Sequence, residues 1–130
     1  MKIKIVPKKW GREEWIVNNK LYCGKRLTII QDKISSEGKF HYHKIKDETF
    51  FVLEGILLLQ IFYGWIHNIT LNPNDYWRIK PYIKHRFSTK TQTCVFIEFS
   101  THHKDEDTYY EESPNKKTDD NSGIVKENKI

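Results

Sequence analysis

The sequence has little that would place the chain in a membrane or among disulfide-bonded proteins. It contains no run of 18 or more apolar residues, so we expect no transmembrane helix and no membrane partner. Its start, Met-Lys-Ile-Lys-Ile-Val-Pro, lacks the apolar stretch and the small-residue cleavage site of a signal peptide. Only two cysteines occur, Cys23 and Cys94, both in apolar segments. We therefore expect small buried thiols in a reducing, cytoplasmic compartment rather than a disulfide framework.

Helical patterns are also scarce. One turn within residues 7–15 and another near 106–110 are the helical segments that we expect. Short β-forming stretches instead recur between turn signals such as Gly64 and Asn72-Pro73-Asn74-Asp75. These stretches are residues 3–6, 27–30, 49–53, 56–63, 65–71, 76–79, 86–89 and 94–100. The pattern predicts an all-β sandwich or small barrel.

The chain is long enough for one domain. It has 130 residues, and although only 38% are hydrophobic, the aromatic fraction of 14% supplies large side chains for a core. From residue 104 onward apolar residues are sparse, and the run 116–123 cannot support a core. We therefore expect one β-barrel domain over residues 1–111 and a flexible, disordered tail over 112–130.

Charge is distributed unevenly along the chain. Residues 1–103 hold 17 Lys and Arg against 9 Asp and Glu, a net charge of +8, whereas residues 104–130 carry −3. A basic body favours an anionic partner such as a phosphate or a sugar nucleotide, although lysine also serves as a general surface solubiliser. The basic residues are scattered and no DNA-reading helix is recognisable, so we expect no nucleic-acid partner.

Two strand segments are apolar on both faces. Residues 50–53 and 56–59 are consecutive apolar residues, where a sheet with one wet face would alternate. Either two sheets stack closely or a second subunit covers one outer face, and we predict a homodimer.

Four residues have the types and spacing of a metal site. His41 and His43 lie two apart, so a strand directs both imidazoles to one side, and Glu48 opens the next strand after a short connection. His85 begins a separate strand and supplies a third imidazole. Three imidazoles and one carboxylate suit a divalent Mn, Fe, Co, Ni or Zn ion with positions left open for substrate. The alternative is a metal-free sugar pocket.

These residues resemble the motifs of the cupin superfamily. The first cupin motif is Gly, five residues, His-x-His, three or four residues, Glu, six residues and Gly; His41, His43, Glu48 and Gly55 match it, and Ser35 replaces the first Gly. The second motif is Gly, five residues, Pro-x-Gly, two residues, His, three residues and Asn. Its positions are occupied here by Asn74, Lys80, Tyr82, His85 and Thr89. The resemblance implies a double-stranded β-helix, the cupin jelly-roll barrel, with the metal in its mouth.

Further segments look like those of sugar isomerase cupins, namely the mannose-6-phosphate isomerase type II and lyxose isomerase groups. They are Trp10-Gly11, Tyr22-Cys23-Gly24-Lys25 and the closing residues 97–103 with acidic residues after them. An Arg that usually follows the acidic run in those relatives is replaced by Tyr109-Tyr110. The resemblance implies isomerisation or epimerisation of a sugar or sugar phosphate through an enediolate.

Candidate catalytic and binding groups follow from this interpretation. Glu98 interrupts an apolar strand, and since Glu48 is a metal ligand we expect Glu98 to be the general base. Lys25 is expected to polarise a carbonyl or contact an anion, the alternative being a surface lysine. Lys25, Arg26 and Lys39 lie near the metal strands in sequence, so Lys25 and Lys39 are expected to bind phosphorylated substrates.

Other side chains are expected to lie outside the chemistry. We expect His102 and His103 to be exposed and Trp15 to be a packing group.

Two other functions are compatible with the candidate metal ligands and the cavity. An Fe(II) oxygenase needs a similar ligand set, and a non-catalytic carbohydrate-binding module needs only the cavity.

Overall fold

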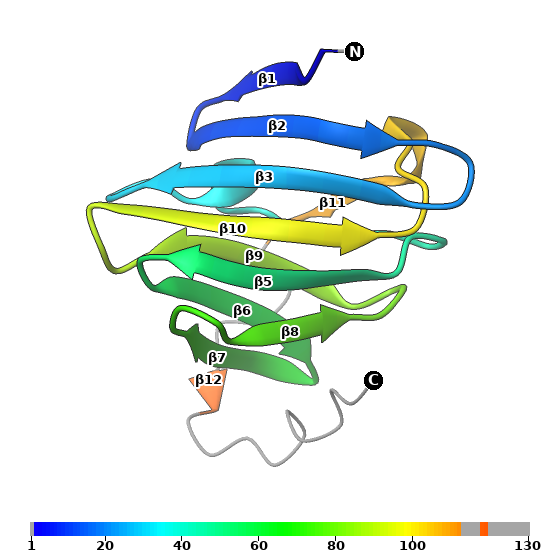
Figure 1. The fold of residues 1–130 in the computed structure, drawn as a ribbon. Coiled ribbons are helices and arrows are strands. Elements are labelled where there is room, and N and C mark those ends of the chain that lie inside the picture. The colour runs from blue at the N-terminus through cyan, green and yellow to red at the C-terminus, as the bar shows by residue number, and fades with distance from the viewer. Residues whose placement is uncertain (1, 113–117, 120–130) are drawn as a thin grey trace.

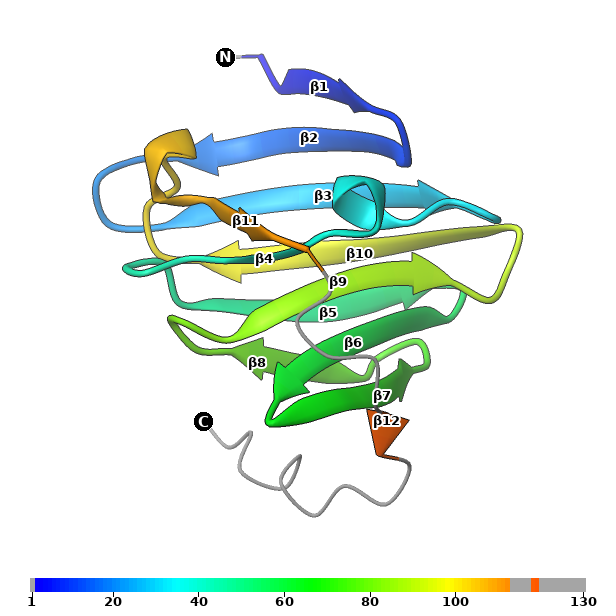
Figure 2. The same ribbon diagram turned by 180° about the vertical axis from the view of Figure 1, so that it is seen from behind.

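The chain forms two β-sheets packed face to face in a computed structural model that describes residues 2–112 and 118–119 (Figure 1). The first sheet runs β1-β2-β3-β10-β5-β8: Lys4–Lys8, Gly11–Asn18, Cys23–Ile30, Thr93–Ser100, Glu48–Glu54 and Tyr76–Ile79. The second, seen from its own side in Figure 2, runs β11-β4-β9-β6-β7-β12: Tyr109–Glu111, Phe40–Tyr42, Lys84–Thr89, Leu57–Tyr63, Trp65–Leu71 and Thr118–Asp119. The expected all-β, double-stranded β-helix is confirmed.

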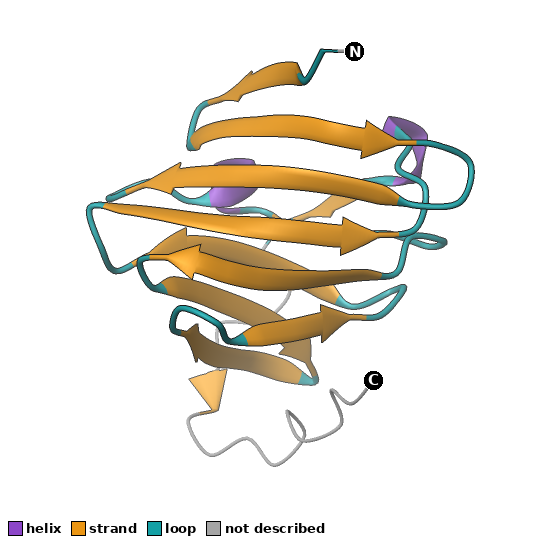
Figure 3. Ribbon diagram, in the orientation of Figure 1, coloured by secondary structure: helices purple, strands orange, loops and turns teal. Residues whose placement is uncertain are grey.

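Helix is confined to two short 3-10 turns among the described residues, η1 (Ser35–Gly38) and η2 (Asp105–Asp107) (Figure 3). The helical turn predicted within residues 7–15 is wrong, because β1 and β2 form a hairpin in which Lys8 pairs with Gly11. Gly11 has a φ of +152°, and a Cβ there would lie 1.8 Å from the carbonyl oxygen of Thr28. Glycine thus lets β2 approach β3 closely at the hairpin.

The core lies between the two sheets. Phe50 and Val52 of β5 face inward with Phe96 of β10, while Phe51 and Leu53 point outward, as the two-residue period of a strand requires. The rings of Phe50 and Phe96 lie 4.9 Å apart between centroids, and Phe87 of β9 packs 5.2 Å from Phe96. The apolar runs therefore supply both a core face and an outer face.

Outward-facing apolar side chains remain on the first sheet. They are Phe51, Leu53, Val95, Ile97 and Phe99 of β5 and β10. Leu53 is 43% exposed and Phe99 is 56% exposed, so the single chain leaves this face partly open to water. The homodimer stays a prediction. Cys23 and Cys94 are free and buried, as expected.

The end of the chain is described only in part. Thr118–Asp119 forms β12, which pairs in parallel with β7 at the edge of the second sheet. The remainder of the predicted tail, residues 113–117 and 120–130, lies outside the described residues. No helix in the described part of the chain is long and apolar enough to cross a membrane.

Two glycines in hairpin turns allow the packing at the β5–β6 turn to be tested. Gly55 and Gly64 have φ values of +77° and +81°, but a Cβ on Gly55 would lie 2.3 Å from the Thr93 carbonyl oxygen, whereas Gly64 has no atom within 4 Å of that position. We expect Gly64→Ala to cost about 1–2 kcal/mol through its backbone conformation alone. Gly55→Ala should cost about 1–3 kcal/mol more, because β10 must move. Urea unfolding measures both, and equal losses would contradict the clash.

Candidate metal centre

The fold brings the four motif residues to one point inside the sandwich. His41 on β4 pairs directly with His85 on β9, His43 follows β4, and Glu48 is the first residue of β5. One ligand atom from each lies within 4.8 Å of the others. β5 and β9 both begin at the same end of the sandwich, on the right in Figure 1, so the cluster lies at that end.

Backbone carbonyls orient two of the imidazoles. His43 Nδ1 lies 3.0 Å from the Asp107 carbonyl oxygen, and His85 Nδ1 lies 2.9 Å from that of Ile83. Because a carbonyl oxygen only accepts, each Nδ1 carries a hydrogen, and in the neutral ring Nε2 then presents a lone pair. These Nε2 atoms lie 3.3 and 3.2 Å from Oε2 of Glu48. Hydrogen bonds of this kind fix ligand orientation around bound metals.

The donor set fits a divalent cation. Glu48 Oε2 and His85 Nε2 are buried and have no hydrogen-bond partner among the described residues. Burial and the neighbouring His85 lower the pKa of His41 well below its ordinary value, so this imidazole is neutral. Burial alone would raise the pKa of Glu48, but the Lys46 ammonium holds it well below its usual range. Lone pairs facing a carboxylate oxygen repel it unless a cation lies between them, and nitrogen and oxygen donors suit Mn, Fe, Co, Ni or Zn.

A buried lysine, absent from the sequence interpretation, lies beside the cluster. Lys46 Nζ lies 3.6 Å from Oε1 of Glu48 and 3.0 Å from Oε2 of Glu98. Burial alone would lower the pKa of Lys46, but attraction to Glu48 and Glu98 raises it above its ordinary value. The sequence feature that could have identified Lys46 as a site residue was its position two residues before Glu48. In a turn, however, that spacing does not fix which way a side chain points.

Glu98 is buried beside the metal ligands without being one of them. Its Oε2 accepts hydrogen bonds from Lys46 Nζ at 3.0 Å and from Ser100 Oγ at 3.0 Å. Burial alone would raise the pKa of Glu98, but the Lys46 ammonium lowers it below its ordinary value. The site therefore holds a second, ionised carboxylate.

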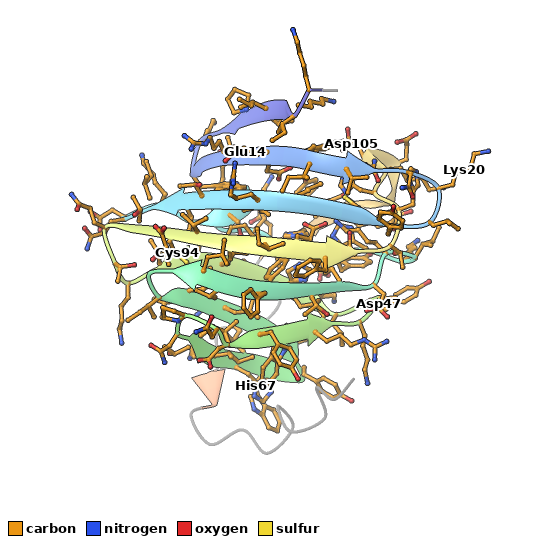
Figure 4. All side chains as sticks on the ribbon, in the orientation of Figure 1. Glu14, Lys20, Asp47, His67, Cys94 and Asp105 are labelled. Carbon is orange, nitrogen blue, oxygen red and sulfur yellow. The ribbon has the colours of Figure 1, made fainter. Side chains whose placement is uncertain are left out.

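The histidines after β10 differ from the expectation. His102 is exposed, as predicted. The prediction that His103 is also exposed is wrong. Its Nδ1 lies 3.0 Å from Lys46 Nζ and its Nε2 lies 2.9 Å from Oδ1 of Asp105, which Figure 4 labels near the end of β2. The return of the chain after β10 thus places His103 against the site.

A cavity of about 240 Å³ joins these groups to the first three strands. Its lining includes the four clustered residues, Lys46, Glu98 and His103, and also Lys4, Glu13, Trp15 and Lys25. Trp15, which was expected to be a packing group, is thus also exposed to the cavity. Lys25 is buried in the cavity wall.

Two basic residues expected near the site lie elsewhere. Lys39 is exposed and is not among the residues that line the cavity. Arg26 points to the outer face of the first sheet because it alternates with Lys25, and its Nη2 lies 2.7 Å from Oε2 of Glu14. Lys25, Arg26 and Lys39 were expected near the site because they lie close to the metal strands in sequence. Of these three residues, only Lys25 lines the cavity.

Asp107 of η2 holds the loop that carries Lys46. Its carboxylate accepts backbone N–H groups from Lys44 at 2.9 Å, Ile45 at 3.2 Å and Lys46 at 2.9 Å, while its carbonyl oxygen accepts from His43. Burial alone would raise the pKa of Asp107, but these backbone donors lower it, so the carboxylate is charged.

We expect Asp107→Ala to destabilise the protein, because bonds to a charged acceptor contribute about 1.5–3 kcal/mol each. It should also weaken metal binding by about 10- to 100-fold, because η2, whose backbone carbonyl orients His43, is no longer tied to residues 44–46. Urea unfolding and competition with a chelator measure the two effects. Glu106→Ala is the matched control, since Glu106 is an exposed neighbour. Equal behaviour of the two variants would show that Asp107 does not organise the site.

No protein-family model matches the sequence, and no curated protein matches it. Solved structures do match the fold. The capsular polysaccharide assembling protein CapF from Staphylococcus aureus is 15% identical, with a TM-score of 0.75 over 86% of this chain and 33% of CapF. Oxalate decarboxylase from Bacillus subtilis is 14% identical, with a TM-score of 0.72 over 83% of this chain and 30% of the enzyme. KdgF from Halomonas sp. is 13% identical, with a TM-score of 0.66 over 82% of this chain and 90% of KdgF. This chain spans about a third of the first two.

Proposed function

We propose that this chain, which has the cupin fold of these structural neighbours, is a metal-dependent isomerase or epimerase of a small sugar or sugar phosphate. The observation that carries the proposal is the pairing of two features in one cavity: a cluster suited to a divalent metal and a separate ionised carboxylate, Glu98. Isomerisation needs an electrophile for neighbouring oxygens and a base for one proton.

His41, His43, Glu48 and His85 would hold a divalent ion, which would supply Lewis-acid polarisation of substrate oxygens. In isomerisation, Glu98 accepts the proton from the hydroxyl-bearing carbon next to the carbonyl and returns it to the carbonyl carbon. The hydroxyl proton moves to the former carbonyl oxygen, so no electrons enter or leave the substrate. Lys46 keeps this carboxylate charged, and its ammonium lies between Glu98 and Glu48. Lys25, which pairs with Glu98 on the neighbouring strand, contacts the charged or carbonyl end of the substrate.

The neighbours' names point to different chemistries: one assembles a capsular polysaccharide and one decarboxylates oxalate. Since one fold serves many reactions, the fold does not select among them. What favours proton transfer here is Glu98, a buried carboxylate that the metal cluster leaves out.

Solvent deuterium tests the proposal. The metal-loaded protein is incubated in D₂O with aldoses, ketoses and their phosphates, and the substrates are followed by NMR. We expect deuterium at the carbon that exchanges its proton, because a proton held on Glu98 exchanges with water. Glu98→Gln should slow this exchange by about 100-fold or more while metal content is retained.

Other outcomes of the same experiment identify the alternatives. Isomerised product without deuterium would rule out the proton-transfer route. Oxygen consumption with iron, absent with manganese, would identify an oxygenase. Sugar binding with neither exchange nor oxygen consumption would identify a binding module.

A further inference from the structure

Three cavity residues form one row across the inner face of the first sheet. Lys4 of β1 pairs in register with Trp15 of β2, and Trp15 pairs with Lys25 of β3. Both ammonium groups lie over the indole ring, with Lys4 Nζ 4.5 Å and Lys25 Nζ 4.2 Å from a ring centroid. The row continues to Glu98 on β10, which pairs with Lys25. The strand register therefore places a cation, an indole and a second cation in line with the proposed base.

The Lys25 ammonium is buried and weakly paired. Its residue is only 2% exposed, and its one ion pair with a described residue joins Nζ to Oε1 of Glu13 at 3.5 Å. This distance is longer than a good hydrogen bond. A buried charge is costly unless it is well paired, and an ammonium carries three donors. Lys25 thus has donor capacity directed at the cavity that it lines.

The carboxylate beside Lys25 is shared among several groups. Glu13 Oε1 accepts the Trp15 indole N–H at 2.8 Å, and Oε2 lies 3.8 Å from Lys8 Nζ. Asp105, at the rim, is engaged by His103. Lys8 and Lys25 therefore share the Glu13 carboxylate, and no ion pair joins Lys4 to a described residue. The side of the cavity formed by β1, β2 and β3 is thus lined by three lysines and one carboxylate.

We infer that Lys25, assisted by Lys4, binds an anionic group of the ligand, and that Trp15 packs against the ligand's carbon skeleton. The substrate class is then a polyhydroxylated molecule of one sugar unit with a single carboxylate or phosphate. A cavity of about 240 Å³ suits one such unit, since it is below the roughly 300–1,000 Å³ of pockets for drug-sized ligands. The inference rests on the proposed function in that the other end of the ligand lies at the metal cluster.

Calorimetric titration of the full chain with glucose 6-phosphate, glucuronate, glucose and inorganic phosphate tests this subsite. We expect at least one anionic sugar to bind more tightly than glucose. The part of this advantage that comes from exposed Lys4 should shrink at high salt, because exposed charges are screened over about 8 Å at physiological ionic strength, whereas the part that comes from buried Lys25 should persist. The stronger of the two anionic sugars identifies the phosphate or the carboxylate. Binding of inorganic phosphate alone supports the phosphate.

Lys25→Met should weaken the preferred anionic sugar by about 10- to 100-fold and leave glucose binding unchanged. Lys4→Met should cause a smaller loss, because Lys4 is exposed. Lys20→Met removes the same charge from an exposed residue after β2, labelled in Figure 4, and is the matched control with no expected loss. If Lys25→Met does not fold, Lys4→Met against Lys20→Met carries the test.

Equal losses from Lys25→Met and Lys20→Met, or equal losses for glucose and the anionic sugar, would overturn the inference. Binding is measured without turnover, so the subsite and the reaction are separated. Anion preference that depends on Lys25, without deuterium exchange, would retain the subsite and reject the isomerase. Deuterium exchange in neutral sugars, without any anion preference, would reject the subsite alone.

Discussion

His85→Ala should purify with almost no bound metal under conditions in which the unmodified protein holds about one ion per chain. His85 is fully buried, its Nδ1 is fixed by the Ile83 carbonyl, and its Nε2 faces Glu48 Oε2 at 3.2 Å. The substitution removes a metal ligand directly. The loss of metal affinity should therefore exceed the roughly 10- to 100-fold loss typical of substituting a residue that only hydrogen-bonds to a ligand. Elemental analysis and chelator competition measure it, and His43→Ala should behave alike.

His102→Ala is the control for this experiment. His102 is exposed and its Nδ1 contacts the Asn19 carbonyl oxygen, so its loss removes an imidazole without touching the cluster.

Metal should also raise the melting temperature of the unmodified protein, because a ligand that binds only the folded state stabilises it by about 2.7 kcal/mol at 100 times its dissociation constant. Full metal content in His85→Ala would disprove the ligand assignment.

Lys46→Met should destabilise the metal-free protein by about 3–5 kcal/mol, the usual cost of removing one partner from a buried ion pair. Lys46 and both of its carboxylate partners are buried, so little water is available to solvate Glu48 and Glu98 once the ammonium is gone. The length of the methionine side chain keeps the packing close to that of lysine. Urea unfolding with a chelator present measures the change.

Two further variants separate charge from packing. Lys44→Met removes an exposed lysine from the same connection, where its ammonium lies 4.4 Å from the Tyr109 ring centroid, and should cost about 0.5–1 kcal/mol. Adding Glu98→Gln to Lys46→Met should recover part of the loss, since one of the two uncompensated charges is then removed. A double variant no more stable than Lys46→Met would show that the ammonium acts through packing.

Turn residues and β-forming stretches were sufficient to predict much of the sandwich from the sequence. The bounds of β7 and β8 agree with the sequence prediction because Gly64 and the turn at residues 72–75 delimit them. The β1–β2 hairpin was missed because its Lys9-Trp10 turn, followed by Gly11, has no strong turn signature. Its geometry depends on the close approach of β3, which is a tertiary contact.

The site divides in the same way. His41, His43, Glu48 and His85 were found from spacing because strand alternation acts over a few residues. Lys46, His103 and Asp107 were not, since each has a partner that lies 52 to 64 residues away in sequence. The orientation of Lys25 and Arg26 shows the limit of charge alone: adjacent residues of one strand face the cavity and the outer surface.

Two departures from the cupin motif fall at residues with a left-handed backbone. Asn74 and Tyr82 occupy positions where the motif has glycine, and both have left-handed φ values, +73° and +71°. Asparagine adopts this conformation more readily than most residues other than glycine. Tyr82 is held in it by a hydrogen bond from its N–H to the His43 carbonyl oxygen at 2.6 Å, and its ring stacks on Tyr42. The loop before His85 thus keeps a glycine-like shape without glycine.

The contacts of Asp107 with residues more than 60 positions earlier in the chain affect when a newly made chain can bind a metal ion. A nascent chain that has emerged from the ribosome as far as residue 100 already contains all four ligands, yet the carbonyl that fixes His43 and the carboxylate that gathers residues 44–46 are still to come. Until they arrive, either ring nitrogen of His43 is free to bind an ion. We therefore expect the site to reach its final geometry only after residue 107 has packed against residues 43–46.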